Sequence, residues 1–430
     1  MALRAVMDDA VFRKCAWRLL PLITAGFLIN FLDRTNVGFA ALTMNRELGL
    51  TPSVYGLGAG IFFVSYSVFQ VPANLMLHRI GARRWLFLIL VAWGAAAAAT
   101  ATVKGATSFY VLRFLVGMAE AGFFPGIILY LTFWFPRRHL GRFTSIFMCS
   151  NPVSFVIGGP VGSAILSLDG MAGLHGWQWL FILEGLPACL VGIAILKLLP
   201  DGPADASWLT QDESRFVLTA ITAEQSGKEQ QLLPALRDFR VATLAIVYGG
   251  VLFAIYGFGF WLPLLVQSVG FSTTATGFVV AALYVAATPV MILWALSSDR
   301  RDERIWHAAL AILVAAVALL FASAVHNSFV MLISLALTGA ALYSALTPFY
   351  GVASALLSGP AMAGGIALIN MAGGLLGGFA GQPVIGMIRE KTGSFGPALA
   401  IMAASLAVAG LLVIALGRAM MPRALRTGAI

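Results

Sequence analysis

Four charged side chains stand inside long apolar stretches of the chain: Asp33, Arg34, Arg113 and Glu120. If these stretches span a bilayer, each charge costs about 2.5–3.5 kcal/mol at the centre of a helix, and ionisable groups at that depth are functional by default. A guanidinium group suits a carboxylate because its planar fork can bond both oxygens. We therefore predict that the two arginines bind an anion and that the two acids carry protons.

The spacing of these four residues suggests how they work together. Arg113 and Glu120 are seven apart and share one helix face, whereas Asp33 and Arg34 are adjacent and cannot point the same way. One hypothesis is purely structural: two ion pairs hold two helices together. In the functional hypothesis, ionised Glu120 competes with the substrate for Arg113, and protonation removes this competition. Asp33 would then be a second protonation point that controls closure.

The composition identifies the kind of protein that holds these charges. The chain has 430 residues, of which 60% are hydrophobic and 10% charged. Soluble domains are about 45–50% apolar and about 25% charged, so a bilayer must cover the excess apolar surface. The net charge of +9 would suggest nucleic acid binding in a soluble protein, but membrane proteins collect Lys and Arg in cytoplasmic loops. We expect a lipid bilayer as partner and no nucleic acid.

Apolar runs of about 20 residues predict an all-α polytopic membrane protein with twelve transmembrane helices. The predicted spans are 17–41, 53–77, 84–103, 108–135, 142–168, 177–199, 240–267, 274–297, 304–325, 328–351, 360–388 and 395–417. Glu184 is expected near the outer surface, at the start of its helix, with a structural role. No cleavable signal peptide is expected, because the first apolar run is long and lacks a small-residue cleavage site.

One long polar stretch divides the chain. Residues 200–240 are predicted to be a cytoplasmic linker with a short amphipathic helix, between a six-helix bundle over 1–199 and another over 241–430. With both termini inside, the outside segments hold few basic residues, namely Arg46, Lys104, Arg389 and Lys391. The other loops are rich in Lys and Arg, which predicts an inner (plasma) membrane protein with cytoplasmic termini.

The two halves also resemble each other in sequence. "HRIGARRW" from His78 to Trp85 matches "DRRDERIW" from Asp299 to Trp306, and "GGPVG" from Gly158 matches "GQPVIG" from Gly381. Pro125 matches Pro348 at nearly the same offset. These matches indicate a duplicated six-helix unit, which is how many secondary carriers are built.

Several stretches carry a resemblance to a known family. The basic turn after the second helix and the central linker resemble the major facilitator superfamily. Within it, the chain is similar to the anion:cation symporter family in "NFLDRTNVGFA", "FVSYSVFQVPANLMLHRIGARRW", "RFLVGMAEAGFFPG", "GWQWLFILEGLPA" and "IALINMAGGLLGGFAGQPVIG". This resemblance covers nearly the whole chain and implies two pseudo-symmetric six-helix bundles in the major facilitator fold.

The resemblance also implies roles for individual residues. Its anion-binding arginines match Arg34 and Arg113, and its protonatable acids match Asp33 and Glu120. Further candidates for binding the uncharged part of the substrate are Tyr66, Asn370, Tyr256, Trp261 and Gln267; the alternative for them is packing or a helix-to-helix hydrogen bond. Candidates for gating lie in the basic turns of the two halves: Arg79, Arg83, Asp299, Arg300 and Arg304. His78 stands where the family's first turn carries an Asp.

These patterns predict a proton-coupled symporter that takes up a small organic anion, a carboxylate, by alternating access. It would work as a monomer, with no metal and no cofactor. One alternative is a drug/proton antiporter of the same superfamily, because "GGPVG" resembles the antiporter motif; two buried arginines argue against cationic drugs. A non-transporting anion sensor is a further alternative, although the chain has no evident output module. An enzyme is least expected, because no nucleophile–base or metal-binding pattern occurs.

Overall fold

Long apolar runs form the helices of this chain, and all regular elements in the described residues are helical. The structure, a computed structural model, describes residues 2–148, 150–222, 238–357 and 361–420. The helices up to the central linker are α1 (Ala2–Glu47), α2 (Pro52–Ile80), α3 (Ala82–Ala99), α4 (Ala106–Glu120), α5 (Phe123–Thr132), α6 (Arg137–Met148), α7 (Ser150–Leu166), α8 (Gly176–Leu198) and α9 (Gln211–Thr222). Those after it are α11 (Phe239–Ser268), α12 (Thr273–Arg301), α13 (Ile305–Ala324), α14 (Ser328–Leu356), α15 (Ala361–Gly373), the π-helix η4 (Gly374–Ala380), α16 (Gly381–Thr392) and α17 (Gly396–Met420). Three short 3-10 turns, η1 (Thr100–Thr102), η2 (Met171–Gly173) and η3 (Pro203–Asp205), lie in connections.

Twelve segments of the described chain are long and apolar enough to cross a membrane, which confirms the predicted number of spans. Most boundaries agree within a few residues. The first helix differs most, since α1 begins well before residue 17 and ends at Glu47. Its extra residues include fully buried Phe12, whose ring lies 6.3 Å from Phe135 and 5.9 Å from Phe216. Burial of this early apolar side chain extends the helix beyond the hydropathic run.

Contacts divide the chain into two compact units. The first comprises Met1–Ala40 and Val64–Lys228, and the second comprises Ala41–Phe63 and Glu229–Ile430. The first part of α2 therefore packs within the second unit, where the Tyr55 hydroxyl donates to the carbonyl of Phe260 at 2.9 Å. The proposed bundle boundaries near residues 199 and 241 stay a prediction.

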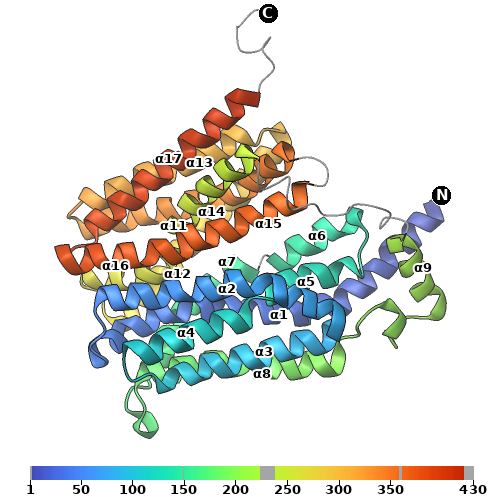
Figure 1. Cartoon of the computed structure of the whole chain (residues 1–430), viewed down its shortest axis with the longest axis horizontal. Helices are drawn as coiled ribbons and strands as arrows, with labels where there is room; N and C mark the ends of the chain where they lie inside the picture. Colours follow the sequence, from blue (N-terminus) through green and yellow to red (C-terminus); the bar gives the residue numbers. More distant parts are fainter. Residues whose placement is uncertain (1, 149, 223–237, 358–360, 421–430) are drawn as a thin grey trace, which may run out of the picture. The chain divides into compact units, whose positions relative to one another are not determined.

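In the first unit, α3 and α8 lie side by side along their length (Figure 1). Their backbones approach closely at two glycines: a Cβ on Gly94 would lie 2.7 Å from the carbonyl oxygen of Gly185, and one on Gly185 would lie 2.9 Å from that of Gly94. Small residues permit this approach between membrane helices. Trp93 precedes Gly94 on α3, and Glu184 precedes Gly185 on α8. The contact between the two glycines therefore holds Trp93 and Glu184 at the same level of the unit.

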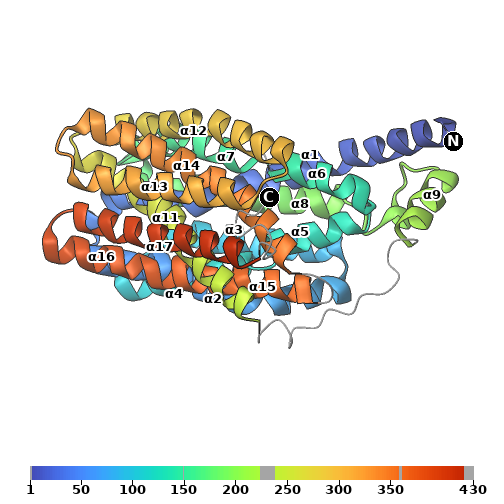
Figure 2. The same cartoon turned by 90° about the horizontal axis from the view of Figure 1, so that it is seen from above.

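In the second unit, α13 lies beside both α14 and α17, and α14 also lies beside α12 (Figures 1 and 2). Helix α11 packs against α15 and η4. Pro383, in the first turn of α16, has no N–H to donate to the carbonyl of Phe379, four residues earlier. This lost hydrogen bond fits the placement of a π-helix just before it, a local widening that is common at functional sites.

The central linker contains the amphipathic helix that its sequence predicts. Helix α9 buries Val217 and Ile221 on one face. The Lys14 ammonium on α1 forms an ion pair with Glu213 at 2.7 Å. These contacts attach the linker helix to the first unit.

Candidate functional site

Asp33 is an enclosed charged residue in the middle of α1. The residue is 3% exposed, and both carboxylate oxygens accept hydrogen bonds: Trp93 Nε1 of α3 donates to Oδ2, and Asn36 Nδ2 donates to Oδ1 at 2.7 Å. Arg113 and Glu120 act on it electrostatically. The structure therefore brings Asp33 together with the other predicted charged residues of the first unit.

Arg34 and Glu120 form an ion pair between α1 and α4. Glu120 is 1% exposed, and the guanidinium carbon of Arg34 lies 5.1 Å from the centre of the Tyr66 ring and 5.3 Å from that of Phe31. A cation over a ring face gains electrostatic stabilisation, more so when it is desolvated. Tyr66 thus contacts Arg34, a predicted anion-binding residue. The sequence alone did not indicate this contact.

Helix α4 ends at Glu120, at a break in the fourth span. Pro125, in the first turn of α5, cannot donate to the carbonyl of Ala121, and its ring crowds that carbonyl. Gly122 at the break lies against α2, since a Cβ there would be 2.6 Å from Cβ of Ala73. This predicted span is therefore two helices, and the acid stands at their junction.

The observed ion pair differs from the one that the seven-residue spacing suggested. Seven residues along an α-helix amount to about 10.5 Å, which is too far for a direct contact between Arg113 and Glu120 side chains that project in parallel. Arg34 comes from a neighbouring helix and reaches Glu120 directly. Arg113 is itself 2% exposed. The group that Glu120 neutralises is thus Arg34.

Glu184 was wrongly expected near the start of its helix at the outer surface. It is the ninth residue of α8, is 6% exposed, and has Asp33 and Asn36 in its electrostatic surroundings. A carboxyl group in the third turn of an apolar helix was the signal that could have identified it. The first unit therefore contains five buried or nearly buried charged groups, three of them acidic, in its described spans.

Asn370 in the second unit belongs to a chain of hydrogen bonds. The Tyr350 hydroxyl of α14 lies 2.7 Å from Asn370 Oδ1 of α15 and 2.8 Å from the Tyr248 hydroxyl of α11. Asn370 stands out in the sequence as a polar residue in an apolar run, but the two tyrosines do not, because they stand about a hundred residues apart in the chain. Only the packing of three helices brings the three side chains together.

The other predicted residues of α11 lie elsewhere along that helix. Tyr256 packs on Phe63 with ring centres 4.2 Å apart, and Trp261 donates from Nε1 to Gln382 Oε1 at 3.2 Å. Gln267 lies in the last turn and contacts Thr273 of α12 at 3.4 Å. Gln267 is 19 residues beyond Tyr248, or about 28 Å along the helix axis. The structure therefore does not bring Gln267 together with Asn370.

The basic turn of the first unit finds an acidic partner outside the motif. Asp201, after α8, accepts from the backbone N–H of Arg83 at 2.8 Å, and Arg83 Nε donates to the carbonyl of Leu196. A carboxylate at the start of α3 is favoured by the helix dipole. Gly81, the residue before α3, has a φ of +89°, a conformation that favours glycine. Arg79 is exposed.

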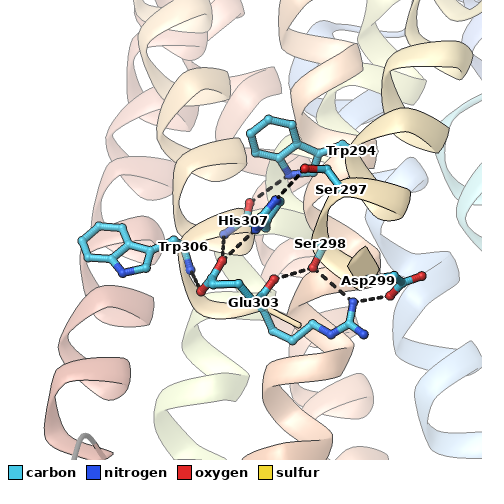
Figure 3. Close-up of polar contacts among 8 residues, drawn as sticks. Trp294, Ser297, Ser298, Asp299, Glu303, Trp306 and His307 are labelled. Atoms are coloured by element: carbon cyan, nitrogen blue, oxygen red, sulfur yellow. Dashed lines mark hydrogen bonds and ion pairs between the residues drawn. The ribbon is translucent and has the colours of Figure 1, made fainter. Parts of the chain in front are cut away.

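The corresponding turn of the second unit is a dense polar network between α12 and α13 (Figure 3). Arg304 forms an ion pair with Asp299 and donates to Ser298 Oγ at 3.1 Å. His307 lies with Nδ1 2.7 Å from Glu303 Oε2 and Nε2 3.2 Å from Ser297 Oγ. A carboxylate only accepts, so the proton stands on Nδ1. Arg300 is exposed.

Acidification should loosen this turn. Burial alone would raise the pKa of Glu303, but hydrogen bonds from the backbone N–H of Trp306 and from His307 hold that pKa below its ordinary value. A lowered pKa means stabilisation that is present above the unfolded value of 4.5 and lost as the pH falls through the folded value. We expect residues 302–308 to lose amide hydrogen-exchange protection at pH 4 relative to pH 7, after correction for intrinsic rates.

Two variants make that measurement decisive. In Glu303→Gln, residues 302–308 should show the weaker amide protection, that of the unaltered chain at pH 4, at both pH 4 and pH 7. Asp302→Asn should behave like the unaltered chain, because Asp302 is exposed with φ of +47° and asparagine tolerates that conformation. Equal protection at the two pH values in the unaltered chain would contradict the assignment.

A helical chain with twelve candidate spans, and with acids and arginines buried together inside one unit, is the architecture of a secondary carrier. The chain belongs to the Major Facilitator Superfamily, which it matches over residues 23–382. It is a multi-pass membrane protein, and its family transports solutes rather than catalysing reactions.

Individual relatives are similar along nearly the whole chain. It is 43% identical over 424 residues to a "Putative tartrate transporter" of Agrobacterium vitis, covering 98% of this chain and 94% of the relative. It is 36% identical over 397 residues to a "Quinolone resistance transporter" of Acinetobacter baumannii, covering 91% of each chain. A crystal structure of a bacterial homologue of the human lysosomal transporter Spinster has the same fold, with a TM-score of 0.76, 18% identity, and coverage of 93% of this chain and 96% of that one.

Proposed function

We propose that this transporter takes up a small organic carboxylate together with protons across the inner (plasma) membrane, as a monomer with both termini in the cytoplasm. The observation that carries the proposal is the buried ion pair between Arg34 and Glu120. While Glu120 is ionised, it occupies the guanidinium group that would otherwise bind the anion. Binding of a proton and binding of a carboxylate therefore favour each other.

The exchange of partners balances charge once both the proton and the carboxylate are bound. Protonation of Glu120 leaves Arg34 as a cation without its acid, and the substrate carboxylate then replaces that acid. A guanidinium group offers two parallel N–H donors to a carboxylate. Arg113, buried in the same unit and acting on Asp33, provides a second cation for the anion. Asp33 is the second candidate for protonation, held by Trp93 and Asn36.

The tartrate-transporter relative supports the class of substrate, since tartrate is a small dicarboxylate. Arg34 and Arg113, both in the first unit, offer two cations for such an acid. Sugar acids and aromatic acids would meet the same charge requirement.

Uptake into proteoliposomes tests this proposal. With an inward proton gradient and a panel of labelled carboxylates, the unaltered protein should accumulate at least one acid. Arg113→Ala should reduce that uptake at least about tenfold, because hydrogen bonds to charged groups contribute about 1.5–3 kcal/mol. The matched control is Arg389→Ala, since Arg389 lies over the Phe395 ring at 4.6 Å in the last turn of α16. Equal loss in both variants would contradict a specific role for Arg113.

A drug/proton antiporter is the second candidate, favoured by the relative that is a quinolone resistance transporter. The same vesicles distinguish the two. Extrusion of quinolones with no accumulation of any carboxylate would replace the symport proposal with the antiporter.

A further inference from the structure

We propose that Glu184 keeps one proton throughout the transport cycle and acts as a positioning residue, whose neutral carboxyl group holds the Asn36 amide against Asp33. The inference rests on the proposed function, because it concerns how Asp33 is held ready to bind and release a proton. It assigns a role to a buried acid that the exchange of partners at Arg34 does not use.

Glu184 is a buried acid without a cation beside it. It is 6% exposed, and its Oε2 has no hydrogen-bond partner in the described part of the chain. The groups of the described residues that act on it are Asp33 and Asn36, and neither is a cation. An isolated carboxylate is so costly in an apolar interior that it takes up a proton instead. Glu120 differs, since Arg34 is its partner.

The neighbouring helices bring no basic side chain to the level of Glu184 in the residues that the structure describes. Helix α7 contains no charged residue, and the charged residues of α3 are Arg83 and Arg84, in its first turn. Trp93, which stands level with Glu184, is nine residues beyond Arg84, or about 13.5 Å along the axis. Within α8 the one basic residue is Lys197, 13 residues beyond Glu184 and about 20 Å away.

The balance of charge in the first unit gives the same protonation. Its spans bury or nearly bury three acids and two arginines: Asp33, Glu120, Glu184, Arg34 and Arg113. If all five were ionised, the unit would enclose a net charge of −1, which is costly inside a bilayer. With Glu184 neutral, the other four charges cancel, and adding one proton and one carboxylate group preserves that balance. The proton on Glu184 is therefore a resident proton, separate from those that are transported.

The Asn36 amide connects the two acids. Its Nδ2 donates to Asp33 Oδ1 at 2.7 Å, and it also hydrogen-bonds with Glu184. Asn36 is 2% exposed, and its Oδ1 has no partner among the residues described. An ionised Glu184 could only accept, and it would compete with Asp33 for the Asn36 N–H groups. A neutral Glu184 also supplies an O–H donor, for which Asn36 Oδ1 is an available acceptor, so the amide keeps its N–H directed at Asp33.

Close helix packing holds the groups around Asp33 in place. A Cβ on Gly185 would lie 2.8 Å from a backbone nitrogen of α3, so α8 cannot move nearer and Glu184 stays level with Trp93. Trp93 donates to the second oxygen of Asp33. Each carboxylate oxygen of Asp33 therefore has its own donor, and Glu184 fixes the donor that could otherwise turn, since the Asn36 amide can present either its N–H₂ or its oxygen.

Infrared spectroscopy of the protein in lipid tests the resident proton without any substrate. The unaltered protein should show the C=O stretch of a protonated carboxyl group at about pH 8, where an ordinary Glu is ionised. Glu184→Gln should lack this band, and Glu213→Gln, in the linker helix, should retain it. No band at this pH, or the same band in Glu184→Gln, would overturn the proposal.

Uptake into proteoliposomes tests the positioning role. Glu184→Gln should retain proton-driven uptake and its pH dependence, because the amide supplies both a donor and an acceptor, as the neutral acid does. Glu184→Leu supplies neither, so Asn36 can turn its oxygen toward Asp33. The ionised form of Asp33 then loses a donor, and the pH dependence of uptake should shift by about one unit to higher pH.

A matched variant in the same helix separates this shift from a general loss of stability. Gln178→Leu removes another polar side chain of α8, which donates to the carbonyl of Ala101 at 2.7 Å. It should leave the pH dependence of uptake unchanged. An equal shift in Gln178→Leu and Glu184→Leu would contradict the positioning role. If Glu184→Leu fails to fold, the infrared band and Glu184→Gln still decide the question.

The outcomes separate this inference from the proposed function. If the unaltered protein accumulates a carboxylate and Glu184→Gln does not, Glu184 carries a transported proton, and the inference is wrong while carboxylate symport stands. If the unaltered protein accumulates no carboxylate, the proposed function fails and the positioning role fails with it, whatever the infrared band shows.

Discussion

Replacing Glu120 with Gln is expected to abolish accumulation of the substrate against its gradient while leaving exchange of substrate across the membrane. Gln resembles the protonated acid in shape and cannot ionise. Arg34 then loses its competing carboxylate permanently, so the anion can bind without a proton. Driven uptake should fall at least about tenfold, and binding should lose its dependence on pH, because a coupled proton no longer contributes free energy.

Counterflow in proteoliposomes without a proton gradient distinguishes this result from simple misfolding, since an intact but uncoupled carrier still exchanges labelled for unlabelled substrate. Glu213→Gln provides the control. Glu213 is also ion-paired, with Lys14, but it lies in the linker helix outside the candidate spans. Full proton-driven accumulation by Glu120→Gln would show that another acid, such as Asp33, carries the coupled proton.

The second large effect concerns folding. Gly377→Ala is expected to destabilise the protein by about 1–3 kcal/mol or more, the usual cost of overpacking a close-packed interior. A Cβ at this position would lie 2.4 Å from the carbonyl oxygen of Gly249 and 2.4 Å from the backbone nitrogen of Phe253. Both are backbone atoms of α11, so no side-chain rotation relieves the overlap, and α11 must separate from η4.

Thermal unfolding in detergent, followed by tryptophan fluorescence, measures this cost. Gly259→Ala is the matched variant, because Gly259 also belongs to α11 and no atom lies within 4 Å of a Cβ there. It should leave the melting temperature unchanged or slightly higher, since alanine favours helix over glycine. Equal melting temperatures for the two variants would contradict the backbone contact.

The sequence predicted the class of fold well, because the signals that define it are local. Hydropathy over about 20 residues located all twelve spans, and the polar stretch after Pro200 predicted α9. The extension of α1 to Phe12, the break after Glu120 and the π-helix from Gly374 were not predicted. Each depends on a contact with another helix or on a lost backbone hydrogen bond.

The candidate site could be predicted residue by residue but not as an arrangement. A charge in an apolar run is visible in the sequence, and so Arg34, Arg113 and Glu120 were identified. Which of them pair is decided by neighbouring helices, since α1 supplies the partner of Glu120. Tyr350 was missed because one tyrosine in a spanning helix is unremarkable until Tyr248 and Asn370 are seen beside it. Glu184 was placed wrongly because it was assumed to stand at the start of its helix.

The packing of residues 41–63 with the second unit also affects how such carriers can be recombined. A hybrid of two relatives joined within the 200–240 linker would separate this stretch, which is the end of α1 and the start of α2, from the partners with which it folds. A Cβ on Gly56 would lie 2.5 Å from the carbonyl oxygen of Gln382, so the fit tolerates little mismatch. A functional exchange of substrate preference between relatives therefore requires three crossovers: one at each end of residues 41–63 and one in the linker, so that 41–63 and the later helices come from the same donor.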